Sequence, residues 1–109
     1  MPDIPHALLL PFQTGCRWIN FQQIVRLEGI GNYTICMFAG GSHLMVARTI
    51  KCLLNRIPTG QFVRLHRKHL VNRAFVANVQ PAAYAVDLSN GGQASIARRQ
   101  MVALMRASA

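Results

Sequence analysis

The sequence predicts a mainly β domain with many short strands and two short helices. Short runs of apolar, β-branched and aromatic residues recur along the chain, with turn residues between them. The pair Asn90-Gly91 lies between two such runs and is a strong hairpin signal, because both residues tolerate positive φ. The apolar spacing changes to a helical period at only two places, one mid-chain and one at the end.

We expect residues 1–15 to form an extended N-terminal arm, with a candidate strand at Ala7–Phe12, and residues 16–109 to form the domain. Arg17-Trp18-Ile19 is a short strand candidate, and Asn20–Gln23 is a turn or a single helical turn. The next strands are predicted from β-branched and aromatic residues at Ile24–Gly29, Tyr33–Phe38 and His43–Ala47. The turns between them are expected at Gly29–Asn32 and Gly40-Gly41.

The first helix is predicted to begin after Thr49, whose hydroxyl can cap it. Its apolar stripe consists of Ile50, Leu53, Leu54 and Ile57, and Pro58 with Gly60 ends it. The final helix has one apolar face, made of Met101, Leu104 and Met105. Between the two helices we expect five extended segments, at Phe62–His66, Leu70-Val71, Phe75–Val79, Tyr84–Leu88 and Gln93–Ile96.

The charge balance indicates a polyanionic partner. The 109-residue chain has 12 Lys and Arg against 3 Asp and Glu, a net charge of +9. Ten of the cations are Arg, which is suited to bidentate contacts with phosphate and guanine. Since 51% of the residues are apolar, the chain can build a core. A folded basic domain that binds DNA, RNA or an anionic membrane surface is therefore favoured over a charge that serves solubility alone.

Several classes of protein are excluded by the sequence. No apolar run reaches the roughly 18 residues of a membrane-spanning helix, and the sequence predicts no signal peptide. Cys16, Cys36 and Cys52 cannot all pair within one chain, and their spacing matches no zinc pattern. We therefore expect reduced thiols, a cytoplasmic protein, and no metal or other cofactor.

The segment 64–73 has four cations, two histidines and one asparagine, with no acid. Leu65, Leu70 and Val71 within it are expected to anchor it to the core and so fix where its cations point. Arg98-Arg99, at the start of the last helix, is a second basic site. The domain has only Glu28 and Asp87 as acids, so the sequence indicates no pair of groups for general acid–base catalysis.

Four sequence blocks, in order and with the right spacing, resemble one known family. Phe62–Asn72 resembles the F-x-R-I-H-R-S-x-x-V-N signature of the LytTR domain, the DNA-binding output domain of bacterial LytR/AlgR-type response regulators. The other three are Ile24–Tyr33 (family I-x-x-I-E-A-x-G-N-Y), Ala47–Leu53 (T-L-K-x-L), and Leu88–Gly91 with Ala97–Arg99 (L-x-N-G and S-R-R). Lys68 stands where the family usually has Ser, which adds a cation.

The resemblance implies an elongated fold of three antiparallel sheets with two short helices. It also implies a sequence-specific transcriptional regulator whose loops read successive major grooves of double-stranded DNA, typically on direct repeats. A second copy on the DNA and a separate sensory or receiver protein are the further partners implied. Base reading is implied for Asn72, Arg99, Arg98, Tyr33 and Asn32. Phosphate contact is implied for Arg67, Lys68, Arg73, Arg48 and Lys51, and a supporting role for His66 and Arg64.

Three alternatives stay open at this point. Asn72 could bridge two strands instead of reading a base. The charge alone also fits a small basic RNA-binding or ribosome-associated β protein, although the dispersed aromatic residues favour duplex DNA. An enzyme would need a nucleophile such as Cys36 with His43 or His66, and the sequence offers no orienting acid for it, so we interpret the chain as a non-enzyme.

Overall fold

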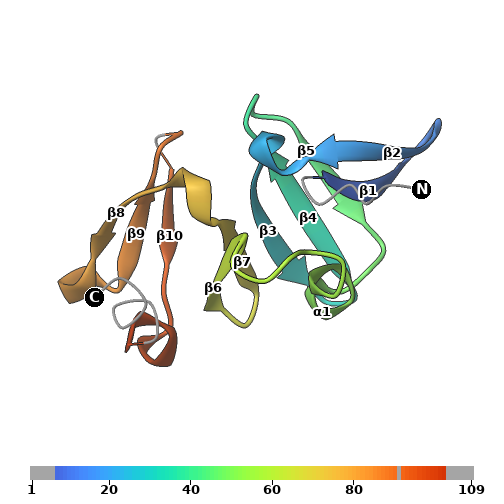
Figure 1. Cartoon of the computed structure of the whole chain (residues 1–109). Coiled ribbons are helices and arrows are strands. Elements are labelled where there is room, and N and C mark those ends of the chain that lie inside the picture. The colour runs from blue at the N-terminus through green and yellow to red at the C-terminus, as the bar shows by residue number, and fades with distance from the viewer. Residues whose placement is uncertain (1–6, 91, 103–109) are drawn as a thin grey trace.

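The structure is a computed structural model that describes residues 7–90 and 92–102, and it is mainly β (Figure 1). Its strands are β1 (Ala7–Phe12), β2 (Gly15–Asn20), β3 (Ile24–Ile30), β4 (Tyr33–Phe38), β5 (His43–Val46), β6 (Phe62–His66), β7 (His69–Asn72), β8 (Val76–Gln80), β9 (Ala85–Leu88) and β10 (Gln93–Ser95). The helical elements are α1 (Ile50–Leu54), the 3₁₀ turns η1 (Phe21–Gln23), η2 (Arg73–Phe75) and η3 (Pro81–Ala83), and residues 98–102.

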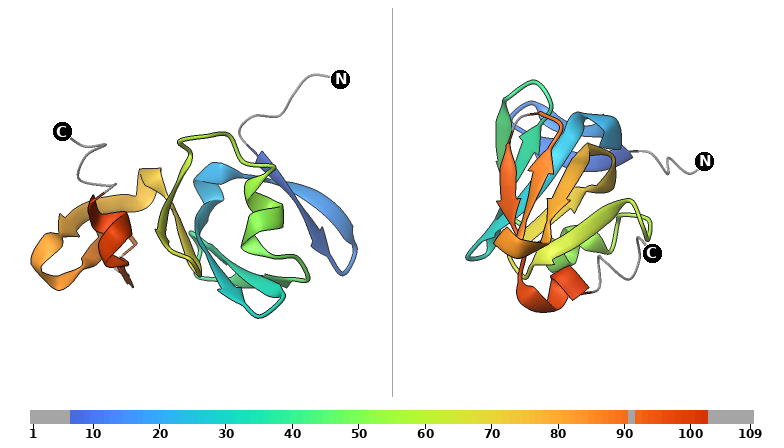
Figure 2. Two further views of the ribbon diagram at one scale, coloured as in Figure 1. Left: turned by 90° about the horizontal axis from the view of Figure 1, so that it is seen from below. Right: turned by 90° about the vertical axis from the view of Figure 1, so that its left-hand side faces the viewer.

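The strands form three antiparallel sheets along a molecule of 44 × 29 × 24 Å (Figures 1 and 2). The hairpin β1–β2 is one sheet, and the second has the strand order β5-β4-β3-β7-β6. The third sheet has the order β10-β9-β8 and lies at the other end of the molecule (Figure 1). The predicted class, an elongated arrangement of three antiparallel sheets with two short helices, is confirmed.

A first hydrophobic core lies between the five-stranded sheet, the β1–β2 hairpin and α1. Leu8 and Leu10 of the hairpin are buried there with Leu27 of β3, Cys36 of β4 and Leu53 of α1. Each buried aliphatic side chain of this kind stabilises the fold by about 1.5–3 kcal/mol. From Ala7 onward, the N-terminal arm is therefore packed against the rest of the domain.

A second core joins the five-stranded sheet to the three-stranded one. It contains Val71 of β7, Leu65 of β6 and Val86 of β9. Successive strand residues point to opposite faces, so Leu70 contributes to the first core and Val71 to the second. The β6–β7 hairpin is thereby held by both cores.

Several predicted boundaries differ from the structure by one or two residues, and the ends of α1 and of the segment before β9 differ for a clear physical reason. The helix α1 ends at Leu54 and not at Ile57, because Arg56 N–H and Ile57 N–H donate to the oxygens of Leu53 and Leu54 at 3.0 and 3.1 Å, the i→i+3 pattern of a tightened last turn. Ile57 is still buried in the first core. Tyr84 does not begin a strand, since its φ of 49° is left-handed and it ends η3.

The second helix is present from residue 98. Met101, the first residue of its predicted apolar face, is buried in the second core. Leu104 and Met105 lie outside the described residues.

Candidate nucleic-acid interface

The turn between β6 and β7 carries Arg67 and Lys68, both exposed at its tip. Beneath the tip, Arg64 donates from Nε to the oxygen of His66 at 2.9 Å and from its terminal nitrogen to the oxygen of Arg67. Lys68 N–H donates to His66 Nδ1 at 3.3 Å, and Gly29 N–H donates to the oxygen of Lys68 at 2.8 Å. These contacts fix the backbone of the turn, so the backbone positions from which the side chains of Arg67 and Lys68 extend are defined.

A hollow of about 210 Å³ adjoins this turn and is lined by cations from separate segments. Lys51 comes from α1, and Arg64, Arg67 and Lys68 come from the β6–β7 hairpin. Tyr33, 48% exposed, lines it from the start of β4. An anionic group placed here would face positive charge from two sides.

Gly29 explains how these segments come so close together. A Cβ atom on Gly29 would lie 3.2 Å from Ile50 Cδ1 of α1 and 3.8 Å from the Cα of Lys68. The next turn, Gly31-Asn32, joins β3 to β4, and Gly31 has a φ of +59° that favours glycine. Asn32 is exposed beside it.

Arg48 and Lys51 lie at the start of α1, and both are exposed. The Thr34 hydroxyl, fully buried in β4, donates to the oxygen of Arg48 at 2.7 Å. The Thr49 hydroxyl caps the helix by accepting from Cys52 N–H at 3.2 Å. The backbone at Arg48 is therefore bonded to β4, and the first turn of α1, which carries Lys51, is fixed by its cap.

Arg98 and Arg99 are exposed at the start of the helix that follows β10. Ala97 N–H donates to the oxygen of Leu65 at 2.7 Å, which ties this helix start to β6. The Arg98 guanidinium lies 5.6 Å from the centre of the Tyr84 ring, a cation–π contact. Sequence reasoning missed this role of Tyr84, because nothing in the local sequence indicates its left-handed backbone.

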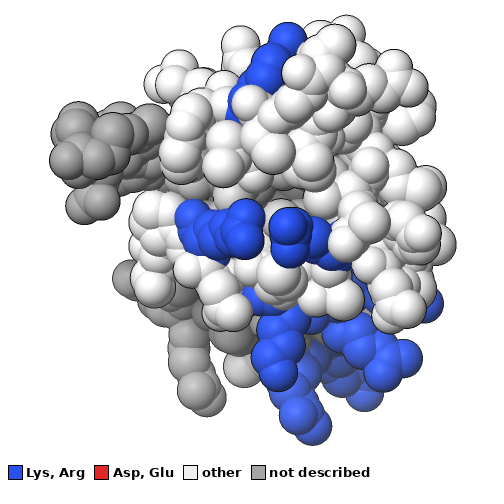
Figure 3. All heavy atoms as spheres, turned by 90° about the vertical axis from the view of Figure 1, so that its right-hand side faces the viewer, with Lys and Arg blue, Asp and Glu red and all other residues white. Residues whose placement is uncertain are grey.

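The β3–β4 turn, α1, the β6–β7 turn and the helix at 98–102 all lie along the lower edge of the molecule in Figure 1. Figure 2 shows the same segments from below. In Figure 3, Lys and Arg side chains gather over the lower part of the molecule, and no Asp or Glu of the described residues is visible on that face. We call this the cationic edge, and it comprises Asn32, Tyr33, Arg48, Lys51, Arg67, Lys68, Arg98 and Arg99.

Asn72 is a correction to the sequence prediction, because it is not available to read a base. Its side chain is fully buried, and Nδ2 donates to the oxygens of Phe21 at 2.7 Å and Ile24 at 2.9 Å. Its Oδ1 accepts from Ala74 N–H at 3.0 Å. Both sides of the amide are thus used inside the protein, and the alternative in which Asn72 bridges backbone segments describes the structure.

Arg73 is not brought to the cationic edge. It follows β7 at the end away from the β6–β7 turn, and four extended residues span roughly 13 Å. Arg73 is exposed, and its N–H donates to the oxygen of Gln61 at 3.0 Å. Any phosphate that it contacts would be a different one from those facing Arg67 and Lys68.

Comparison with known proteins decides the family. The family model of the LytTr DNA-binding domain matches residues 15–108, nearly the whole chain. The chain belongs to the LytTR DNA-binding domain family. A solved LytTr DNA-binding domain from Bacillus cereus shares the fold, with a TM-score of 0.77 at 15% identity over 93% of this chain and 94% of that one. A search of curated proteins found no match.

In this LytTR domain, the alternative of a Cys–His enzyme is contradicted by the position of Cys36. Its side chain is fully buried in the first core, and burial raises the pKa of its thiol to about 12. A nucleophilic cysteine must be reachable and must ionise near neutral pH. His43 is exposed on the neighbouring strand and pairs in register with Met37, not with Cys36.

The described residues of the LytTR domain contain no helix long and apolar enough to cross a membrane. They also contain no group of three or more His, Cys, Asp or Glu side chains placed to hold a metal ion.

His69, which follows the cationic turn, is expected to make stability fall as pH drops below about 6.5. Its Nδ1 is buried, has no hydrogen-bond partner among residues 7–90 and 92–102, and lies 3.9 Å from Glu28 Oε1. Burial lowers the pKa of His69, and it outweighs the opposing effect of the Glu28 carboxylate. The unfolded chain then binds more protons than the folded one, so acid destabilises the domain. Thermal melts from pH 7.5 to 5 of the parent and of His69→Gln test this, and an equal pH dependence in both would contradict it.

Proposed function

We propose that this LytTR domain binds duplex DNA through the cationic edge and regulates transcription. The observation that carries the proposal is the convergence of cations from α1, the β6–β7 turn and the helix at 98–102 on one edge. Cations fixed in this way can follow the phosphates that border a groove, while side chains between them reach base edges. The family supports the choice of DNA as the partner.

Exposure and position indicate which side chains contact phosphates and which contact bases. Phosphate contact is assigned to Lys51, Arg67 and Lys68, which line the hollow, and to Arg48, which is exposed just before the Thr49 cap of α1. Arg98, whose guanidinium lies over the Tyr84 ring, is assigned to a fifth phosphate. Base reading is assigned to Arg99, Tyr33 and Asn32, which are exposed at two separate places on the same edge. One place is at the β3–β4 turn of the five-stranded sheet, and the other is in the helix that follows β10 of the three-stranded sheet. In an elongated molecule this supports contact with successive major grooves.

Further features of the proposal rest on the family alone. Two copies would bind adjacent direct repeats, and a separate sensory or receiver protein would supply the signal. The domain would act in the bacterial cytoplasm, which fits its unpaired cysteines Cys16, Cys36 and Cys52.

The RNA-binding alternative is less well supported. Single-stranded RNA is commonly held by aromatic side chains grouped on one sheet face. The exposed aromatic residues of the described chain are Trp18 on β2, Tyr33 on β4 and Tyr84 before β9, in three different sheets or connections. They form no common stacking surface.

The salt dependence of binding tests the proposal. With about five phosphate contacts, the slope of log K against log[salt] for duplex DNA should be near −4.5, from about −0.9 per contact. The measurement is fluorescence anisotropy from 50 to 300 mM salt, with structured RNA and single-stranded DNA as competitors. A slope near zero, or a preference for RNA over every duplex tested, would overturn duplex DNA as the partner.

Lys68→Ala is expected to weaken binding to all duplexes by a similar factor. Lys68 is exposed at the tip of a fixed turn, so its loss removes one phosphate contact and makes the salt slope about 0.9 less steep. Arg73→Ala removes the same charge away from the edge and is the matched control, with a smaller change expected. If Lys68→Ala altered base preference and left the slope unchanged, Lys68 would be a base reader.

A further inference from the structure

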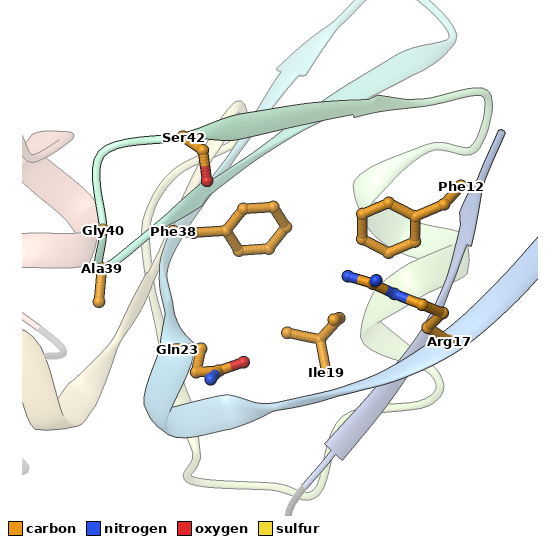
Figure 4. A pocket seen from close by; sticks show the side chains of 8 residues that line it. All are labelled: Phe12, Arg17, Ile19, Gln23, Phe38, Ala39, Gly40 and Ser42. Carbon is orange, nitrogen blue, oxygen red and sulfur yellow. The ribbon is translucent and has the colours of Figure 1, made fainter. Parts of the chain in front are cut away.

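We propose that the cavity between the β1–β2 hairpin and the β4–β5 turn binds a small aromatic carboxylate. The cavity has a volume of about 360 Å³, within the range of small-molecule sites. Its walls come from segments that are distant in sequence, with Phe12 and Arg17 on the hairpin and Phe38 and Ser42 on the turn (Figure 4).

Arg17 supplies the positive end of this cavity, and it is an exposed residue on the same face of β2 as the buried Ile19. It pairs in register with Leu10, which is fully buried, so Arg17 occupies the face of β2 that points toward the core. Its guanidinium carbon lies 4.3 Å from the centre of the Phe12 ring. Among the described residues, no carboxylate pairs with it.

The Arg17 guanidinium lies beside the Phe12 ring, and in Figure 4 its nitrogen atoms point into the cavity. A guanidinium placed there can hold a carboxylate through two parallel hydrogen bonds. The ligand should therefore carry a carboxylate at this end.

Two phenyl rings and one aliphatic side chain form the middle of the cavity. Phe12 and Phe38 both pack against the first core and remain partly exposed, and Ile19 lies between them. A flat ring placed there would cover apolar surface that is now in contact with water. An aromatic body attached to the carboxylate fits this arrangement better than an aliphatic acid.

The other end of the cavity is polar. In Figure 4 the amide of Gln23 and the hydroxyl of Ser42 both point toward the cavity from the side opposite Arg17. An amide and a hydroxyl can each donate to or accept from a hydroxyl group on the ligand. The complete ligand is then an aromatic carboxylate with a polar substituent on its far side.

The cavity lies away from the cationic edge. Phe38 is the last residue of β4, and Tyr33 of the edge is the first, so the two sites are at opposite ends of one strand. A ligand in the cavity leaves the proposed DNA contacts uncovered. DNA binding and carboxylate binding can therefore be measured separately, and either proposal can fail while the other holds.

The test is an NMR titration of the folded domain with 4-hydroxyphenylacetate. We expect saturable shifts of backbone amides at residues 12–23 and 38–42, with a Kd on the order of 1 mM for a ligand of this size. The neutral amide, 4-hydroxyphenylacetamide, should bind about tenfold more weakly, because it lacks the charge-assisted hydrogen bonds to Arg17. Acetate is the control for anions that gather at the cationic edge.

Two variants in the cavity and one control variant outside it locate the site. Arg17→Gln should weaken 4-hydroxyphenylacetate about tenfold, and Arg56→Gln, an exposed Arg outside the cavity, should leave the Kd unchanged. Ser42→Phe should fill the cavity and abolish the shifts, and thermal melts show that each variant is folded. The proposal is overturned if the amide binds as well as the acid, if shifts appear only at the cationic edge, or if Arg17→Gln has no effect.

Discussion

Asn72→Ala is expected to lower the free energy of unfolding by about 3 kcal/mol and to leave the base preference of the folded domain unchanged. The amide of Asn72 satisfies the carbonyl oxygens of Phe21 and Ile24 and caps η2 through Ala74 N–H, all in a fully buried position. Removing it leaves buried polar groups without partners, and each such group costs about 1–3 kcal/mol. In a domain of this size the loss lowers Tm by roughly 10–20 °C.

The measurement is a pair of thermal or urea melts with binding to a panel of single-base-substituted duplexes. Asn32→Ala is the matched control, since Asn32 is exposed in the β3–β4 turn and is assigned to a base. It should keep the parent's Tm and change the base preference. An Asn72→Ala domain that melts like the parent but loses base preference would restore Asn72 as a reader.

The contrast between Asn72 and Asn32 shows what the sequence could not reveal. Both residues lie in blocks that resemble the family; Asn72 is the last residue of β7, and Asn32 lies in the turn between β3 and β4. Whether such an amide faces DNA or the interior depends on what lies opposite. For Asn72 the partners are Phe21 and Ile24, 51 and 48 residues away in the chain. Local patterns carry no information about partners at that distance.

Features set by local chemistry were predicted well. The β3–β4 and β4–β5 hairpins, the Thr49 cap and the anchoring of Leu65, Leu70 and Val71 in a core follow from turn residues and local apolar patterns. The position of Arg17 and Phe12 beside Phe38 depends on how the hairpin docks on the five-stranded sheet. The separation of Arg73 from Arg67 likewise depends on the length of β7, which the sequence predicted as two residues and the structure has as four.

Arg99→Ala is expected to remove discrimination at a guanine-containing position of the DNA site, by about 1–3 kcal/mol, without lowering Tm. Arg99 is exposed in the first turn of the helix at 98–102, where a cation opposes the helix dipole by about 0.3–1 kcal/mol. Arg99 at this position therefore lowers the free energy of unfolding, which supports a role for Arg99 in binding DNA. The backbone beneath it is fixed, since Ala97 N–H is bonded to Leu65 and Met101 is buried in the second core.

Arg98→Ala provides the comparison that separates base reading from charge. The Arg98 guanidinium is held over the Tyr84 ring, so it is less free to extend into a groove than that of Arg99. Its loss should weaken binding to all duplexes similarly and reduce the salt slope by about 0.9.

Binding of each variant to a panel of single-base-substituted sites, with a melt of each free protein, distinguishes the two roles. If the base preference is lost in Arg98→Ala instead, the roles are exchanged. If both variants bind every site as tightly as the parent, the helix start does not touch DNA, and the edge formed by α1 and the two turns must hold the duplex without it.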